Sequence, residues 1–409
     1  MTALRRLSAF LPVLVFVFLA LQAAHLKSPP SRFACADGAA AATAADELQR
    51  YMQDRTAGRP NLRVVPRAVM AAFESAASGL LSLGFVAPEE SRLYQGFSGK
   101  GPYKIDAVDT RCVAAETALL MFVLVVLSPI LLLSYLWLRR TLSRALFVAA
   151  CMFVVIGWHP DVISLVILGG GIFADWPHSY YLFDQHAHAE NFWALGVVML
   201  FYLALANAGR LRPVHFVALA VLGQLSLEYF GPLLVGAGLL VLVMLPGDGD
   251  RPTARRHGTA LTMAAALGTL AAAALAAGVF YLLGGSVKVI LATPENPHQH
   301  IDNNIAWMNV VIANLVMMNL PALIAGLLVG LVDGLLPGPG VDRSRAARDM
   351  VVLSAMILGF VGIFLVGIFT ASYPSEMGRQ FLPMALLSGF LGTRSGAWLV
   401  AVAMARGKA

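Results

Sequence analysis

Charged side chains are scarce in this chain. Only 13% of its 409 residues are Asp, Glu, Lys or Arg, about half the share that is typical of a soluble domain. Hydrophobic residues make up 58% of the chain, and they recur in runs long enough to cross a hydrocarbon core about 30 Å thick. The scarcity of charge argues against a soluble enzyme, and the apolar runs predict an all-α polytopic membrane protein.

Several common sequence motifs are lacking as well. The chain has no Walker phosphate loop, no GxGxxG before a helix and no zinc-finger spacing. It also has no internal repeat with a period of about 20–50 residues. The net charge of +6 does not indicate nucleic-acid binding, because Lys and Arg in the short loops of a membrane protein set its orientation instead.

Cysteine is rare, and its placement is informative. Of the three cysteines, Cys35 and Cys112 bracket the one long hydrophilic segment, and Cys151 lies in an apolar run. Two cysteines on an oxidising membrane face can pair. On the chain-entropy estimate, closing a loop of this length would contribute roughly 4 kcal/mol. We predict a Cys35–Cys112 disulfide, with two free thiols as the alternative.

The apolar runs divide the chain into three parts. Residues 1–26 hold the first run, which follows Arg5 and Arg6 and predicts a signal-anchor helix, with a cleaved signal peptide as the alternative. Residues 27–114 form the long hydrophilic segment. Residues 115–409 form a multi-helix domain with spans expected at 116–137, 142–158, 191–208, 213–228, 231–246, 258–284, 304–336, 350–372 and 380–403.

Two of these segments have further features. Within the hydrophilic segment, 66–85 has apolar residues at helical spacing, and Pro66 suits a helix start. This helix either lies flat in the membrane interface or belongs to a small extracytoplasmic cap. The run 304–336 is long for one crossing, which favours a bent or re-entrant piece at the sequence MMNLP.

Basic residues predict the orientation. Fifteen Lys and Arg side chains fall in six short segments, namely the N-terminus, 138–144, 209–213, 247–257, 341–349 and the C-terminus. The short loops on the other side hold only two basic residues, Lys288 and Arg379. These loops are 159–190, 229–230, 285–303 and 373–379. Positive charge favours the cytoplasmic side. We therefore predict about ten crossings, with both termini in the cytoplasm and the long loop outside.

Titratable residues gather in the loops predicted to face outward. In FDQHAHAENF, the residues Asp184, His186, His188 and Glu190 occupy every second position, so they share one face if the segment is extended. The same side holds Glu228, His298, His300, Asp302 and Arg379.

Three interpretations of this outward set remain open. One is a divalent metal site built on His186, His188 and His300, because imidazole and carboxylate are good ligands for Zn²⁺. Another is acid–base chemistry on a phosphorylated substrate, with Arg379 holding the phosphate. The third is a solvated loop whose polar residues cap the next helix.

The order of parts and four short stretches resemble a known family. The stretch DELQRYMQDRTAGRPNLRVVPRAVMAAFESAASGL has an acid, a Tyr, a Gly-Arg and then R-x-x-P opening a helix. In SYYLFDQHAHAENFWALGVVMLFYLALANAGRLRP, a Tyr and an Asp precede a helix that ends in basic residues. LGQLSLEYFGPLLVG supplies a later acid, and GRQFLPMALL an Arg-x-x-x-Pro helix start. Together these features resemble the GT-C superfamily of polytopic glycosyltransferases.

This resemblance implies transfer of a sugar from a polyprenyl-phosphate donor on the outer face of a bacterial-type inner membrane. The family's base lies soon after the first helix, but this chain has no acid there before Asp37. By context the resemblance assigns the base to Asp46 or Glu47, with Asp184 as a rival. Arg379 and a histidine of the outer loops would steady the leaving phosphate. No cofactor is expected.

Two other functions fit parts of the sequence. A transporter or metal-handling permease would use the outer histidine loops and bind a divalent metal. A polysaccharide polymerase or ligase would also use outer Arg and His, but its large outer loop usually lies nearer the C-terminus. The partners expected for the transferase are the polyprenyl-phosphate sugar and membrane lipid, with no nucleic acid.

Overall fold

The structure is a computed structural model. It describes residues 64–83, 188–227, 229–244, 251–282, 308–335, 342–370 and 381–407, and a few single residues between 121 and 133. Nearly all of these residues are helical, and no strand occurs among them. The described part of the chain is therefore all-α, as the sequence predicts.

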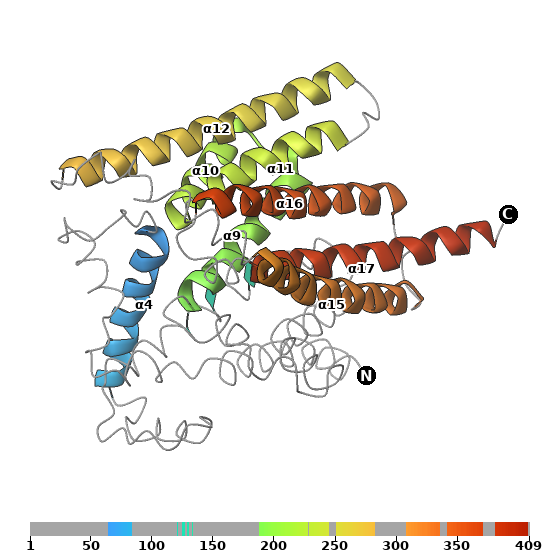
Figure 1. Cartoon of the computed structure of the whole chain (residues 1–409), viewed down its shortest axis with the longest axis horizontal. Helices are drawn as coiled ribbons and strands as arrows, with labels where there is room; N and C mark the ends of the chain where they lie inside the picture. Colours follow the sequence, from blue (N-terminus) through green and yellow to red (C-terminus); the bar gives the residue numbers. More distant parts are fainter. Residues whose placement is uncertain are drawn as a thin grey trace, which may run out of the picture.

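The helices are shown in Figure 1 and have these bounds: α4 Val64–Ser82, α9 His188–Ala206, the 3-10 helix η3 Ala208–Arg210, α10 Pro213–Ser226, α11 Phe230–Met244, α12 Arg251–Leu282, α15 Met308–Leu335, α16 Arg343–Thr370 and α17 Phe381–Arg406. Each α-helix overlaps a segment predicted from the sequence. Within the described ranges, three stretches are long and apolar enough to cross a membrane: Gly258–Gly278 in α12, Arg343–Ile363 in α16 and Pro383–Arg406 in α17. These lengths agree with a helical membrane protein.

The long helices share one direction. Figure 1 shows α12, α15, α16 and α17 extended along a common axis, whereas α4 runs across that axis at the end away from the C-terminus. Helix α4 packs against α9 and α10. Its Ala77 is fully buried, and Val69 and Phe73 pack against the core. The helix from the long hydrophilic segment thus lies crosswise at one end of the bundle.

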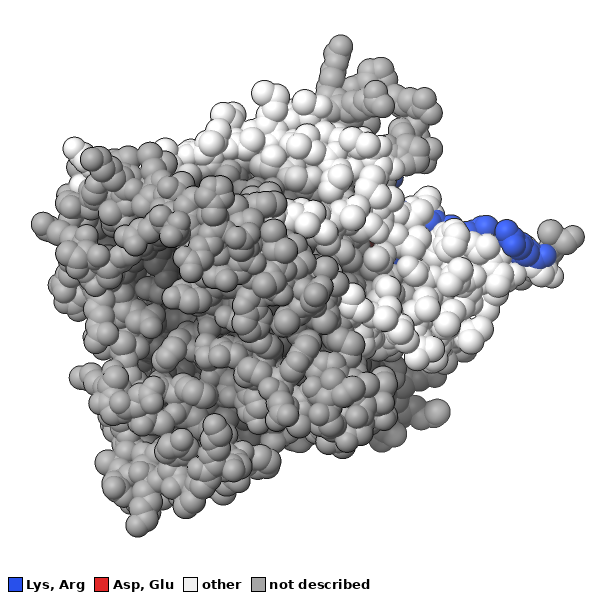
Figure 2. Space-filling model, viewed as in Figure 1, with Lys and Arg blue, Asp and Glu red and all other residues white. Residues whose placement is uncertain are grey.

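Basic residues collect at the other end. Arg343, Arg345 and Arg348 lie in the first two turns of α16, and Arg406 ends α17. Figure 1 places these two helix ends on the same side as the start of α12, and Figure 2 shows Lys and Arg gathered there. The arginine-rich end and α4 are therefore at opposite ends of the described bundle.

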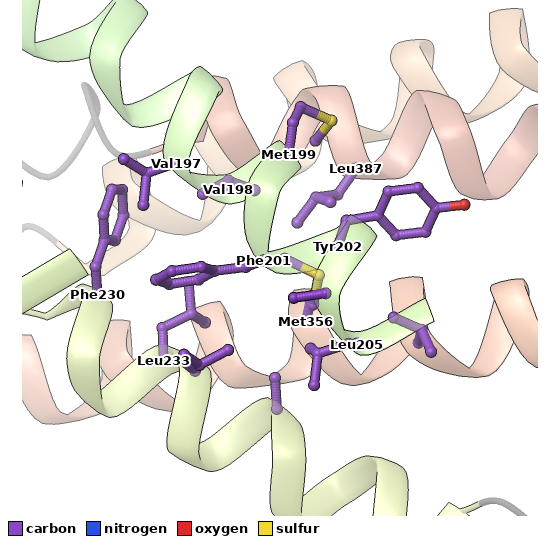
Figure 3. Close-up of a cluster of buried hydrophobic side chains, with 14 of the residues drawn as sticks. Val197, Val198, Met199, Phe201, Tyr202, Leu205, Phe230, Leu233, Met356 and Leu387 are labelled. Atoms are coloured by element: carbon purple, nitrogen blue, oxygen red, sulfur yellow. The ribbon is translucent and has the colours of Figure 1, made fainter. Parts of the chain in front are cut away.

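Helix α9 forms the centre of the core (Figure 3). Its Phe201 and Tyr202 are fully buried. The ring of Phe201 meets that of Phe230 on α11 edge-on at a centroid distance of 6.0 Å, and Phe230 meets Phe360 on α16 at 6.5 Å. Aromatic rings in this arrangement stabilise a core beyond their buried area. Since α9 is apolar on nearly every side, it can be buried on nearly every side.

Helix α15 presents an apolar stripe away from the core. The stripe consists of residues four apart in the sequence, and each is about half exposed. They are Val316, Leu320, Ile324, Leu328 and Val332. Residues four apart lie on one helix face. A soluble protein rarely exposes so long an apolar row, so this face suits contact with lipid.

Helices α15 and α17 run parallel and approach each other at glycines. A Cβ added to Gly326 would overlap the backbone carbonyl of Gly389, and one added to Gly330 would overlap that of Thr393. On α17, Gly396 lies in the same way against the backbone of Leu327. Small residues at four-residue spacing let membrane helices pack backbone to backbone. These contacts set the register of α15 against α17.

The sequence MMNLP lies within one helix, because α15 continues through Pro321. A re-entrant piece, one of the two expectations for this run, therefore does not form. Proline removes one backbone donor from a helix and crowds the preceding turn. Just before it, the Asn319 side-chain amide donates to the Leu315 carbonyl at 2.7 Å and accepts from Ser388 Oγ of α17 at 2.9 Å. These bonds tie the weakened turn to α17.

Helices α10 and α11 are short. Their 14 and 15 residues correspond to about 21 and 22 Å, less than the roughly 30 Å of a bilayer core. Gly231, in the first turn of α11, packs against Thr269 near the midpoint of α12. The break between the two short helices therefore lies beside the middle of α12. The sequence instead predicts two full spans, at 213–228 and 231–246.

Candidate functional site

Most predicted site residues lie outside the described part of the chain. This applies to Asp46, Glu47, Asp184, His186, Glu228, His298, His300, Asp302 and Arg379, and to the predicted disulfide partners Cys35 and Cys112. His188 and Glu190 begin α9, but only their backbone is described. Among the described residues, no group of three His, Cys, Asp or Glu could hold a metal. The outward cluster remains a prediction.

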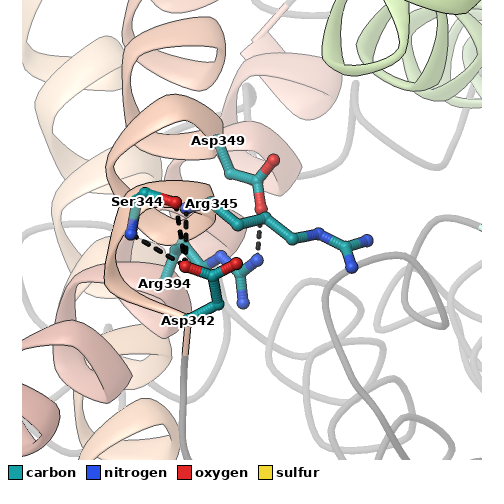
Figure 4. A network of polar contacts seen from close by, with 5 residues as sticks. All are labelled: Asp342, Ser344, Arg345, Asp349 and Arg394. Atoms are coloured by element: carbon teal, nitrogen blue, oxygen red, sulfur yellow. Dashed lines mark hydrogen bonds and ion pairs between the residues drawn. The ribbon is translucent and has the colours of Figure 1, made fainter. Parts of the chain in front are cut away.

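The described helices contain a buried ion pair that our sequence analysis missed. Asp349 of α16 is 1% exposed and Arg394 of α17 is 6% exposed. The Arg394 guanidinium donates to the Asp349 carboxylate (Figure 4). A signal was present, because Arg394 falls inside a predicted span, where an ionisable residue is a candidate functional group by default.

The start of α16 is organised around a second acid. Asp342 Oδ1 accepts hydrogen bonds from the Ser344 backbone N–H at 3.1 Å and from the Ser344 hydroxyl at 2.9 Å. The Arg345 N–H points to the same oxygen at 3.4 Å. An acid at a helix N-terminus satisfies free N–H groups and opposes the positive end of the dipole. Asp342 thus offsets the unfavourable gathering of arginines at this helix start.

Tyr202 brings α9 into the same region. Its side chain is fully buried, and its hydroxyl has no hydrogen-bond partner among the described residues. Its ring meets that of Phe390 on α17 at a centroid distance of 6.0 Å, and α9 also packs against α16. The charged pair therefore lies where three helices converge. A fully buried pair of this kind specifies how helices meet, because removing one partner leaves a buried charge.

A second polar group lies at the break between α10 and α11. We call it the helix-break cluster, and it consists of Trp193, Gln224, Ser226, Gly231 and Thr269. The Trp193 indole N–H donates to Ser226 Oγ at 2.7 Å. The Ser226 hydroxyl in turn donates to the Leu222 carbonyl at 2.5 Å. This chain of bonds joins the first turns of α9 to the last turn of α10.

The rest of the helix-break cluster surrounds Gly231. A Cβ at Gly231 would lie 2.5 Å from Gln224 Oε1 and 2.7 Å from Thr269 Oγ1. Only glycine allows both side chains to reach the first turn of α11. Thr269 Oγ1 is satisfied by the Ala265 carbonyl at 2.9 Å. In contrast, Gln224 is 7% exposed, and its Oε1 has no hydrogen-bond partner among the described residues.

The helix-break cluster and the ion pair differ in their place in the bundle. Helix α4 packs on α9 and α10, the helices that carry Trp193 and Gln224. Glu190 precedes Trp193 by about one helical turn, so the predicted outward stretch leads directly into this cluster. Asp349 lies instead in the first two turns of α16, at the arginine-rich end. The helix-break cluster is therefore the better candidate for contact with a substrate.

No family model, curated protein or solved structure matched this chain when it was compared with known proteins. The resemblance to the GT-C superfamily accordingly depends on the sequence stretches quoted above.

Proposed function

We propose that this protein is a membrane glycosyltransferase. It moves a sugar from a polyprenyl-phosphate donor to an envelope glycan or lipid, on the outer face of a bacterial-type inner membrane. The proposal includes about ten membrane-embedded segments, of which the short helices α10 and α11 do not each make a full crossing. Both termini lie in the cytoplasm. The observation that carries it is the crosswise position of α4 at the end of the bundle opposite the arginines. A helix lying in the interface beside the outer helix ends is what the GT-C resemblance implies.

The chemistry needs one base and one group that stabilises the leaving phosphate. A carboxylate, Asp46 or Glu47 with Asp184 as the rival, removes the proton of the acceptor hydroxyl. The hydroxyl oxygen then bonds to the anomeric carbon with inversion, and the bond from that carbon to the phosphate oxygen breaks. The phosphate leaves with the electron pair. Arg379 and a histidine of the outer loops stabilise its charge through charge-assisted hydrogen bonds.

Reporter fusions test the orientation. Alkaline phosphatase is active only outside the cytoplasm, so fusions after residue 60 or 300 are expected to be active. Fusions after residue 250 or 345 are expected to be inactive, because these positions adjoin the basic segments that should remain inside. Activity at 250 or 345 with none at 60 or 300 would reverse the orientation and overturn the outer-face proposal.

Activity measurements test the chemistry. Purified protein in nanodiscs is given a polyprenyl-phosphate sugar and an envelope lipid extract, and labelled product is measured. Three variants are compared, Asp46→Asn, Glu47→Gln and Asp184→Asn. The variant that removes the base should transfer sugar at least about tenfold more slowly, since a positioned base contributes roughly 10²–10⁴-fold to the rate. His188→Ala should also lower transfer about tenfold, and chelator should have little effect.

The matched control for these variants is Asp342→Asn. This variant makes the same Asp-to-Asn change at the arginine-rich end of the bundle. Because Asn is also a good helix N-cap, α16 should keep its start and sugar transfer should be unchanged. Equal transfer by wild type and by the Asp46, Glu47 and Asp184 variants would remove all three carboxylates as bases. Loss of activity with chelator and its recovery with Zn²⁺ would favour the metal interpretation of the histidines.

A further inference from the structure

The break between α10 and α11 is unusual for its position. It lies beside the middle of α12, next to Gly231 and Thr269. Irregular backbone at membrane depth is tolerated where it is buried in protein or lines a cavity. In membrane transporters, helices interrupted at this depth often form the substrate site. The location of the break does not by itself identify a ligand. The chemistry of the side chains around the break indicates which ligand would fit.

Gln224 supplies the independent observation. Its side chain is more than nine-tenths buried, points at the first turn of α11, and its Oε1 accepts no hydrogen bond within the described helices. Burying an amide without partners costs stability. An amide offers one acceptor oxygen and two donor hydrogens. A ligand group that both donates and accepts hydrogen bonds, such as a hydroxyl, would best satisfy the Gln224 amide.

The neighbours of Gln224 narrow the chemistry. Trp193 is half-buried and offers an aromatic surface. Ser226 is fully buried, and its hydroxyl is engaged by Trp193 and the Leu222 carbonyl, so it positions the indole. The Thr269 hydroxyl donates to the Ala265 carbonyl, which leaves its oxygen as an acceptor. None of these cluster members is charged, so they do not compensate an ion. An alkyl chain would leave the Gln224 oxygen unsatisfied. An aromatic ring beside amide and hydroxyl groups suits a sugar ring, which has apolar C–H faces and hydroxyl edges.

We propose that the helix-break cluster is a subsite for an uncharged sugar ring, with Gln224 binding a ring hydroxyl and Trp193 packing on a ring face. This inference rests on the proposed function for the origin of the sugar, which is the donor or the acceptor of transfer. The subsite lies beside the middle of α12 and includes Trp193, which is less than two turns from the start of α9 and so follows closely on the predicted outward stretch. It would hold the sugar while the outer carboxylate acts.

Fluorine NMR of Trp193 tests this subsite. The six tryptophans are replaced by 5-fluorotryptophan in full-length protein in nanodiscs, and a Trp193→Phe variant identifies the Trp193 resonance. The probes are decyl glucoside, decyl galactoside and decyl mannoside, with decyl phosphocholine as the tail-matched control. At least one glycoside should shift this resonance saturably, and decyl phosphocholine should not.

Variants of the cluster supply the second half of the test. Gln224→Met keeps the length of the side chain but removes the amide, and it should weaken the glycoside response at least tenfold. Thr269→Val should weaken it as well. Thr262→Val is the matched control, because Thr262 lies on the same helix and makes the same bond to a carbonyl four residues earlier, that of Gly258, but it adjoins Gly238 rather than Gly231. Its response should equal that of wild type.

Each outcome decides the inference. A Trp193 resonance that ignores all three glycosides, or shifts equally with decyl phosphocholine, overturns it. So does a glycoside response that survives both Gln224→Met and Thr269→Val. The transfer assay is separate, which distinguishes the two proposals. Glycoside binding without transfer leaves a glycan-binding membrane protein, whereas transfer without glycoside binding removes only this subsite.

Discussion

Asp349→Ala is expected to destabilise the helix bundle severely. The change leaves the Arg394 guanidinium, which is 6% exposed, without the carboxylate that it contacts. Removing one partner of a buried ion pair costs about 3–5 kcal/mol. The free energy of unfolding, measured by titration with denaturing detergent in mixed micelles, should fall by that amount. The yield of folded protein should fall with it.

Two controls separate this loss from a general effect of mutating α16. Arg348→Ala removes a neighbouring charge that is exposed, and it should change the unfolding free energy by less than about 0.5 kcal/mol. The double variant Asp349→Leu/Arg394→Met removes both charges together. It should recover most of the stability, because apolar replacement of a buried pair is often neutral. Equal loss in the single and double variants would show that packing, not charge, matters here.

Gly326→Ala is expected to separate α15 from α17. The added methyl group overlaps the backbone carbonyl of Gly389, which cannot rotate away as a side chain can. Overpacking of this kind costs about 1–3 kcal/mol, and here one helix must move to accommodate it. The measurement is the same unfolding titration. A pair of engineered cysteines at facing positions of the two helices would report the change in their spacing.

Gly362→Ala is the matched control for this prediction. Gly362 lies on α16, and a Cβ there meets nothing within 4 Å. Because Ala is the better helix former by about 1 kcal/mol, this variant should be neutral or slightly more stable. The same substitution is thus expected to have opposite signs at the two glycines. Equal effects at both positions would contradict the close packing of α15 against α17.

The ion pair and the glycine contacts have one consequence for function. Both hold α17 in place, since Arg394 ties it to α16 and Gly389 packs against α15. The core residues Phe201 and Tyr202 then dock α9 on this scaffold. The first turns of α9 carry Trp193 and follow directly from the predicted outward stretch. Disruption of α17 is therefore expected to disturb the candidate subsite as well, although α17 does not form it.

Much of the fold could be predicted from the sequence. The helices at 188–206, 308–335 and 381–406 follow from long apolar runs, because a run of that length can satisfy its backbone only as a helix in lipid. The segment 64–82 could be recognised from its helical spacing and its proline. The collection of arginines at one end follows from their position at alternate ends of successive runs. These are local properties, and each is visible within a short window of sequence.

The tertiary structure decided what depends on contacts between distant residues. Periodicity locates helices but does not say which faces meet, so it could not pair Arg394 with Asp349 or Gly326 with Gly389. Nor could it show that α10 ends and α11 begins beside the middle of α12, which brings Gln224 to Gly231 and Thr269. That placement depends on three helices packing within a few ångströms of one another. The apolar runs by themselves determined a helical membrane protein, and packing at glycines and buried polar groups determined where its candidate site lies.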